Sequence, residues 1–254
     1  MDKVIKKMDK VIYVDVGTHF AQEYRSIFGS EKYFIMKVIR RFIGYYVLRK
    51  GEILSLSQLS DLIRQRRELR RKRKYFLSFF VEANASVIKH SDIYKAADGV
   101  FNCALNGEQQ LSLTNLYLAN SDQLSQGSSI YLTKSNVNAN DAIPTLGVPA
   151  TLFFKSLKSY IESFIGEYSV ILRLNCEGVE DDVIYSAHQV FSDKLVLVMG
   201  SLKDVRDCKG AVAYDALESY LNMNKLPFVF FSSSMYSWIE AHKSINKVCK
   251  NSFE

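Results

Sequence analysis

In the segment VILRLNCEGVEDDVI, residues 170–184, a strand-like pattern is followed directly by a cluster of acidic residues. An apolar, β-branched run ends at Asn175, and four carboxylates follow within residues 177–182. Acids in the first turn of a helix complement the helix dipole, which accounts for the last three of them. Helix capping does not require a Glu-Gly pair, so Glu177, followed by Gly178, is the carboxylate that we expect to face a reacting group. The other acids are Glu180, Asp181 and Asp182, and we expect the last two to face water.

Another strand-like run ends in VDVGTHF, residues 14–20. Gly17 permits a tight turn from strand to helix and lets a ligand approach the backbone closely. Asp15 is expected to hold the amides of that turn or an amine of the ligand. Thr18 and His19 belong to the same turn, and His19 fits equally well as a turn residue or as a side chain that faces a pocket. This stretch predicts a ligand site at the end of the first strand.

Polar residues also follow the second and third strand-like runs. Glu82 ends the run YFLSFFVE, and its two oxygens are suited to accept both hydroxyls of a ribose. Asn84 is expected first as a loop or cap residue and second as a cofactor contact. Asn106 follows the run GVFNCAL, residues 99–105, where Asn106-Gly107 also suits a hairpin turn. We therefore count Glu82, Asn84 and Asn106 among the residues that would contact a cofactor.

Strand-like and helix-like patterns alternate along the chain, and this order predicts the fold class. Strands that alternate with helices pair in parallel through right-handed crossovers, which gives a mostly parallel open α/β sheet flanked by helices. Such sheets bind ligands at the carboxyl ends of their strands, near the point where the strand order reverses. The expected strands are 11–16, 75–82, 99–105, 168–175, 194–201 and 226–233, and the expected helices are 22–28, 31–48, 55–74, 85–97, 151–166, 179–191, 215–225 and 235–250.

The positive charge of the chain is concentrated in one segment. The formal net charge is +6, while residues 64–74, RQRRELRRKRK, hold eight basic residues and one acidic residue. The rest of the chain is therefore close to neutral. The basic run lies in a helical insertion, approximately residues 31–74, which follows the first helix of a single domain spanning 1–254. The polar positions of 31–48 fall on one narrow face, so the rest of that helix is expected to pack well or to lie on an apolar partner.

Cysteine and histidine spacings lack the common metal and redox motifs. The four cysteines form no CxxC pair, and the four histidines form no i,i+4 pair. Reduced thiols are typical of a cytoplasmic protein, and no uncharged apolar run approaches the roughly 20 residues of a transmembrane helix. We therefore expect no built-in metal site and a cytoplasmic location, with peripheral attachment to a membrane surface as a variant of it.

Five segments resemble the FkbM family of S-adenosylmethionine-dependent methyltransferases in order and approximate spacing. They span roughly residues 10–200, interrupted by 31–73, and read YVDVGTHFAQEY, FFVEANASVI, FNCALNGEQQ, LFFKSLKSYI and LRLNCEGVEDDVI. The most specific piece, LNCEGVE, looks like the family's KIDVEGAE, and EAN is similar to the family's EPN. The chain departs from the family's Asp-x-Gly-Ala-Asn-x-Gly turn at Thr18, His19 and Ala21, and Arg173 and Asn175 replace the usual Lys and Asp.

The resemblance implies a Rossmann-like methyltransferase fold and S-adenosyl-L-methionine as the cofactor. It implies an O-methyltransferase that acts on a hydroxyl of a sugar, a glycan or a similar small molecule. Glu177 and Asn175 then take the catalytic positions, with Glu177 as the base or as the group that orients the acceptor. A degenerate, non-catalytic member is the alternative that the departures leave open. The cofactor contacts would be Asp15, Gly17, Thr18, His19, Glu82, Asn84 and Asn106.

The basic run supports two other interpretations. Lysine and arginine clusters bind phosphate backbones, so a nucleic-acid-binding protein or a nucleic-acid methyltransferase is the main alternative. Base-amine methylation typically uses an Asn/Asp-Pro-Pro-aromatic turn after the fourth strand, whereas residues 175–178 here read NCEG. The other interpretation makes 31–74 a module for an anionic membrane or partner surface, which suits a lipid-linked glycan acceptor.

Overall fold

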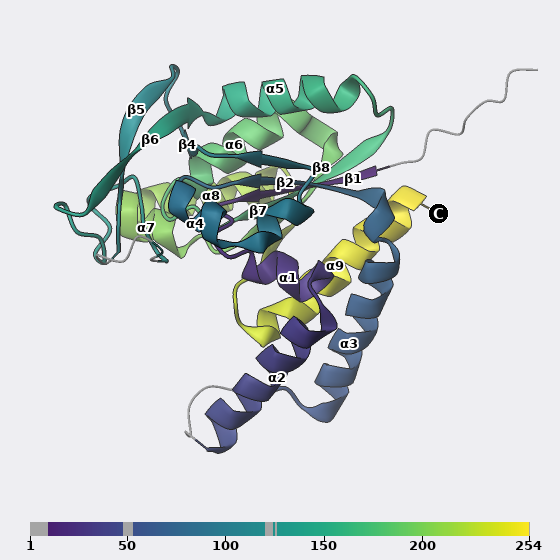
Figure 1. The fold of residues 1–254 in the computed structure, drawn as a ribbon. Coiled ribbons are helices and arrows are strands. Elements are labelled where there is room, and N and C mark those ends of the chain that lie inside the picture. Colours follow the sequence, from purple (N-terminus) through teal and green to yellow (C-terminus); the bar gives the residue numbers. More distant parts are fainter. Residues whose placement is uncertain (1–9, 48–52, 120–123, 125, 254) are drawn as a thin grey trace, which may run out of the picture.

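The computed structural model describes residues 10–47, 53–119, 124 and 126–253, and this part of the chain forms two sheets flanked by helices (Figure 1). The main sheet has six strands in the order β3-β2-β1-β7-β8-β9, and all neighbouring pairs are parallel. This confirms the expected α/β class and is compatible with a Rossmann-like fold. The strands are β1 (Lys10–Val16), β2 (Phe76–Val81), β3 (Gly99–Phe101), β7 (Tyr168–Leu174), β8 (Leu195–Gly200) and β9 (Phe228–Phe230).

Helices cover both faces of the main sheet and create two cores (Figure 1). Alternate residues of a strand point to opposite faces, so both sets must be apolar when both faces are buried. In β1, Ile12 and Val14 enter one core, which includes α5 (Ala150–Glu162), α6 (Glu180–Phe191) and α8 (Ala211–Met223). Val11 and Tyr13 enter the other, which includes α1 (Gln22–Phe28), α3 (Leu56–Arg71) and α9 (Met235–Phe253). The other helices are α2 (Glu31–Tyr46), α4 (Ala85–His90) and α7 (Lys203–Lys209), with 3₁₀ turns at Arg73–Tyr75, Asp92–Ala96 and Ser192–Lys194.

The expected single strand 99–105 is wrong, because the structure divides it between two sheets. β3 belongs to the main sheet, whereas β4 (Ala104–Asn106) begins a three-stranded sheet with β5 (Ser112–Tyr117) and β6 (Ala142–Pro149). Asn102 lies at the break and donates from Nδ2 to the backbone oxygens of Glu82 and Ala83, at 2.8 and 3.1 Å. β6 lies between β4 and β5, so Asn106-Gly107 is not the turn of a hairpin joining them. Helix α7 was not expected from the sequence.

The insertion forms α2 and α3, and its basic run includes one buried arginine. Arg66 is 2 % exposed. Its guanidinium donates to the backbone oxygens of Ser26 and Gly29 and pairs with Glu31, and it lies 4.6 Å from the ring centroid of Phe34. Arg66 therefore fastens α3 to the junction between α1 and α2. Other arginines of the run are exposed to solvent, among them Arg64, Arg67, Arg70 and Arg71.

We expect Arg66→Met to destabilise the fold by about 2–4 kcal/mol, because it leaves buried carbonyl groups without their donor. Arg67→Met is the matched control: Arg67 follows directly in α3 but is exposed, so its replacement should change the free energy of unfolding by no more than about 0.5 kcal/mol. Urea unfolding of both variants measures the difference. Equal stabilities would show that Arg66 does not fasten the insertion.

Candidate functional site

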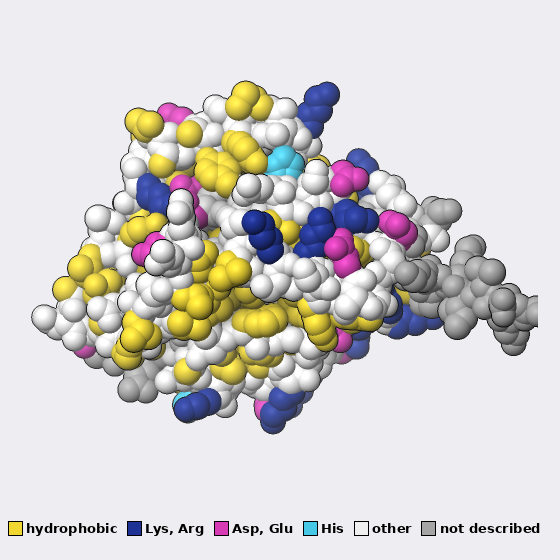
Figure 2. All heavy atoms as spheres, turned by 90° about the horizontal axis from the view of Figure 1, so that it is seen from above, with side chains coloured by type: hydrophobic (Ala, Val, Ile, Leu, Met, Phe, Trp, Pro, Cys, Tyr) yellow, Lys and Arg dark blue, Asp and Glu magenta, His cyan; other side chains and the backbone are white. Residues whose placement is uncertain are grey.

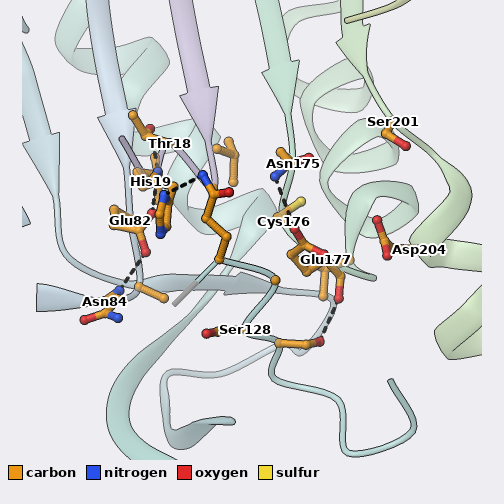
Figure 3. Close-up of a pocket in the computed structure, with 18 of the residues that line it drawn as sticks. Thr18, His19, Glu82, Asn84, Ser128, Asn175, Cys176, Glu177, Ser201 and Asp204 are labelled. Atoms are coloured by element: carbon orange, nitrogen blue, oxygen red, sulfur yellow. Dashed lines mark hydrogen bonds between the residues drawn. The ribbon is translucent and has the colours of Figure 1, made fainter. Parts of the chain in front are cut away.

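A pocket of about 510 Å³ lies at the carboxyl ends of the main-sheet strands (Figure 3). This is where the strand order reverses, because β2 and β3 extend the sheet from one side of β1 while β7, β8 and β9 extend it from the other. The volume falls in the range of about 300–1,000 Å³ that is usual for small-molecule sites. Seven of the residues singled out from the sequence line this pocket: Gly17, Thr18, His19, Glu82, Asn84, Asn175 and Glu177.

Asp15 lies behind the pocket, where its carboxylate pairs with a buried arginine. It is 0 % exposed and accepts from Arg173, with 2.9 Å between Oδ1 and the guanidinium nitrogen. Arg173 also pairs with Glu23 at 2.7 Å and donates to the backbone oxygen of Gly17. Burial raises the pKa of Asp15 to about 6, although the neighbouring guanidinium acts in the opposite direction. The expectation that the Asp15 carboxylate holds the turn amides is therefore wrong, because Oδ1 is in an ion pair in the core and Oδ2 has no hydrogen-bond partner among the described residues. Asp15 does not line the pocket, and its contact with a ligand amine stays a prediction.

Asn106 also lies outside the pocket, contrary to its expected place among the cofactor contacts. It ends β4 in the second sheet and is 5 % exposed. Its side-chain oxygen accepts from the backbone N–H of Glu108 at 3.2 Å. The two residues before it, Ala104 and Leu105, do line the pocket. The strand singled out from the sequence therefore reaches the pocket through Ala104 and Leu105 and not through Asn106.

The turn at Gly17 is held between two neighbouring strands. The N–H groups of Gly17 and Thr18 donate to the backbone oxygen of Val81 at the end of β2, at 2.9 and 3.2 Å. Gly17 has φ +71°, a conformation that glycine adopts without strain. A β-carbon added there would overlap with the carbonyl oxygen of Asn175 and lie 2.6 Å from its carbon. Glycine is thus required because the end of β7 approaches closely.

Glu82 joins the first turn to the loop after β2. Its Oε2 accepts from the N–H of His19 at 2.7 Å, and its Oε1 accepts from the N–H of Asn84 at 2.8 Å. Burial raises the pKa of Glu82, while these two amide donors act against that shift. A carboxylate offers about four acceptor positions, so each oxygen retains capacity toward the pocket. Asn84 also caps α4, because its side chain accepts from the N–H of Ser86 at 3.0 Å, as expected for a cap residue.

His19 combines the two roles that the sequence left open. It has φ +46° in the turn and its side chain lines the pocket. One ring nitrogen lies 3.1 Å from the backbone oxygen of Leu124, and the other lies 3.2 Å from Nε2 of Gln126. Leu124 and Gln126, which lie in the segment between β5 and β6, therefore contact the turn, and Gln126 forms part of one wall of the pocket. Neighbouring residues of this segment, Ser128 and Ser129, line the same wall.

Glu177 is held in the pocket by a lysine that the sequence did not single out. It has φ +60°, and its carboxylate accepts from Nδ2 of Asn175 at 3.2 Å (Figure 3). Its other oxygen pairs with Lys134, which is 6 % exposed and also lies 3.5 Å from the carboxylate of Asp204. The hydroxyl of Ser129 donates to the backbone oxygen of Glu177 at 2.6 Å. Nothing in the polar sequence around Lys134 distinguishes it, because its partner lies 43 residues further along the chain.

The remaining acids of the opening segment serve the local structure. Glu180 is 0 % exposed, and its two oxygens accept from the N–H groups of Cys176 and Gly178 at 3.0 and 2.8 Å. Burial raises the pKa of Glu180 to about 7, although these amide donors oppose the shift. Asp181 and Asp182 both pair with Lys209, at 2.6 and 2.8 Å. The expectation that both face water is wrong for Asp181, which is buried.

The part of the chain that the structure describes contains no group of three or more His, Cys, Asp or Glu residues suited to hold a metal ion. None of the helices described is both long enough and apolar enough to cross a membrane. Comparisons of the chain with protein-family models, with curated proteins and with solved structures found no match.

Proposed function

We propose that this protein is an S-adenosylmethionine-dependent O-methyltransferase with a Rossmann-like methyltransferase fold. One observation carries the proposal: three separate strand ends contribute the Gly17 turn, Glu82 and the Asn175–Glu177 turn to a single pocket where the strand order reverses. These are the segments in which the sequence resembles the FkbM family. The proposed acceptor is a hydroxyl of a sugar, glycan or similar small molecule.

The residues that line the pocket fit this cofactor. Glu82 would accept from the ribose hydroxyls with the capacity that its two amide donors leave, and Asn84 follows beside it. The Gly17 turn, with Thr18 and His19, brings the backbone to the pocket surface. When bound, the cofactor supplies an electrophilic methyl group. The apolar residues Leu105 and Ile130, which also line the pocket, offer a surface for a flat aromatic base.

On this proposal, Glu177 accepts the proton of the acceptor hydroxyl or orients that hydroxyl. Methyl transfer is a direct displacement, so the nucleophilic oxygen must be aligned and its proton needs an acceptor. Asn175 and Lys134 both hold the Glu177 carboxylate, which restricts its rotation and keeps one face toward the pocket. They would act as positioning residues, because they act through Glu177.

The nucleic-acid alternative gains no support from the position of the basic run. The end of α3 leads through the turn Arg73–Tyr75 directly into the start of β2, so Arg70 and Arg71 lie toward the amino ends of the strands. The pocket lies at the carboxyl ends. A nucleic acid bound along these arginines would therefore approach the opposite edge of the sheet.

Calorimetric titration tests the cofactor assignment. We expect S-adenosylmethionine and S-adenosylhomocysteine to bind the wild-type protein, and Glu82→Ala to weaken both by about 1.5–3 kcal/mol. Glu82 also accepts from two backbone amides, so Glu82→Ala could weaken binding either by losing a ribose contact or by displacing the loops. Analogues of S-adenosylhomocysteine that lack a ribose hydroxyl distinguish these two causes. Wild type should discriminate against these analogues, whereas Glu82→Ala should not. No binding to wild type would refute the cofactor, and unchanged discrimination in Glu82→Ala would remove Glu82 from the ribose site.

A further inference from the structure

Helix α2 turns its apolar side to solvent. Ile35, Ile39 and Ile43 follow one another at intervals of four residues, so they form a stripe along the helix. They are 52 %, 43 % and 49 % exposed, and Met36 and Tyr46 beside them are 43 % and 65 % exposed. Among the residues of α2, only Phe34 is buried. The interpretation that this helix packs well is therefore wrong for this stripe, although Phe34 and Val38 do pack on the core.

The face of α2 that packs on the protein carries Lys37 and Arg41 together with the apolar residues Phe34 and Val38. Lys37 is half-buried, donates to Oε1 of Gln22 at 3.1 Å and lies 6.0 Å from the ring centroid of Trp238. Arg41, one turn further along, is half-buried and donates to the backbone oxygen of Ser233 at 3.4 Å. An amphipathic helix on a globular protein normally buries its apolar stripe. In α2 only Phe34 and Val38 pack on the core, while Lys37 and Arg41 contact the protein and the stripe Ile35, Ile39 and Ile43 stays exposed.

Basic side chains flank the exposed apolar stripe. Lys32, Met36 and Arg40 follow at intervals of four residues on the adjacent line of the helix, and both cations are exposed. Glu31 is the only acidic residue of α2, and Arg66 and Arg70 engage it. The exposed side of α2 therefore combines apolar groups with two cations, Lys32 and Arg40, that form no ion pair with a carboxylate of the described residues. Long basic side chains beside an apolar face can reach anionic headgroups while the apolar residues enter the boundary of the bilayer.

We propose that α2 docks this protein on an anionic membrane surface, lying in the interface without crossing the bilayer. The positive charge favours an anionic membrane over a second copy of the chain. Two α2 faces packed together would bring Lys32 and Arg40 of both copies close to one another, and like charges in an interface repel. The other side of the molecule, seen from above in Figure 2, mixes hydrophobic side chains with both basic and acidic ones, as ordinary protein surfaces do.

The contacts of α2 connect this surface to the pocket. Gln22 and Ser233, which Lys37 and Arg41 contact, both line the pocket. Docking through α2 would therefore hold the pocket near the lipid headgroups, where a lipid-linked acceptor presents its hydroxyls. This last step rests on the proposed methyl transfer, whereas membrane docking itself does not and is tested without cofactor.

Flotation of the full chain with lipid vesicles tests the docking. We expect binding to vesicles of phosphatidylcholine with phosphatidylserine, weakened by added salt, and little binding to phosphatidylcholine alone. Replacing both Ile39 and Ile43 by Ser should weaken binding by roughly 10- to 100-fold. Replacing Lys32 and Arg40 by Gln should weaken binding to the anionic vesicles by about fivefold for each charge removed.

The matched control replaces Leu152 and Phe164 by Ser, since these hydrophobic side chains are 46 % and 53 % exposed but belong to α5 and the residues after it. This variant should bind vesicles like wild type, and thermal unfolding should be alike for all variants. The proposal fails if wild type does not float with anionic vesicles, or if the Ile39/Ile43 variant floats as well as wild type. It also fails if wild type sediments as a dimer that the same variant dissociates, because the face would then belong to a second copy.

Discussion

Glu177→Gln is expected to lower the rate of methyl transfer by roughly 10²–10⁴-fold, which is the usual contribution of a positioned acid–base group. Gln keeps the shape of Glu177 and one oxygen that can accept from Lys134, but its amide nitrogen cannot accept from Asn175 as the second carboxylate oxygen does, and it loses the charge that receives a proton. The fold and the affinity for S-adenosylmethionine should therefore survive. Transfer from labelled cofactor to a hydroxyl acceptor measures the rate, and calorimetry measures the affinity. Glu177→Asp, which keeps a carboxylate, should retain more activity than Glu177→Gln.

Asp182→Asn is the control for this experiment. Asp182 lies five residues further along the same segment, pairs with Lys209 and does not line the pocket. Its replacement removes a carboxylate of the same acidic cluster and should leave the rate close to that of wild type. Full activity in Glu177→Gln, or loss of activity in Asp182→Asn, would show that the roles are assigned to the wrong acids. A protein that binds cofactor but transfers no methyl group to any acceptor would instead be the degenerate member.

Gly17→Ala should be the most damaging single substitution at the turn. A residue other than glycine in the left-handed conformation costs about 1–2 kcal/mol. Overlap of the new β-carbon with the carbonyl of Asn175 should add about 1–3 kcal/mol, because backbone atoms of β7 have to move. The same movement displaces the Asn175–Glu177 turn, so we expect cofactor affinity to fall by at least about tenfold, which is 1.4 kcal/mol. Urea unfolding and calorimetry measure the two effects.

Gly210→Ala is the control that separates the two costs of Gly17→Ala, the unfavourable backbone conformation and the overlap of the new β-carbon with β7. Gly210 has φ +89°, which is also left-handed, but an added β-carbon there would meet no atom within 4 Å. This variant should show only the conformational cost and should bind cofactor like wild type. If the two alanine variants lose equal stability, the packing of the Gly17 turn against β7 does not matter for this fold.

Local sequence patterns were sufficient for most of the fold. The apolar β-branched runs predicted β1, β2, β7 and β8 within one or two residues, because their alternating side chains are buried on both faces. The alternation of strands with helices also predicted that Gly17, Glu82 and Glu177 would meet, because parallel strands end at one edge of a sheet. The break between β3 and β4 was not predicted, because Asn102 ends the strand through contacts with residues that precede it in the chain by about twenty positions.

Patterns in the sequence were therefore enough to predict the α/β class, the parallel order of the elements and the strand ends that form the pocket. The role of each charged residue there depends on contacts between segments that meet only in the folded chain. Asp15 pairs with Arg173, Glu177 pairs with Lys134, and Arg66 is buried at the base of the insertion. A buried charge needs a partner, and for these three residues the partner comes from a distant segment of the chain, which single residue types do not reveal. Helix α2 shows the same dependence on distant segments. Its pattern predicted an amphipathic helix, but Lys37 and Arg41 contact Gln22 and Ser233, and the stripe Ile35, Ile39 and Ile43 faces solvent.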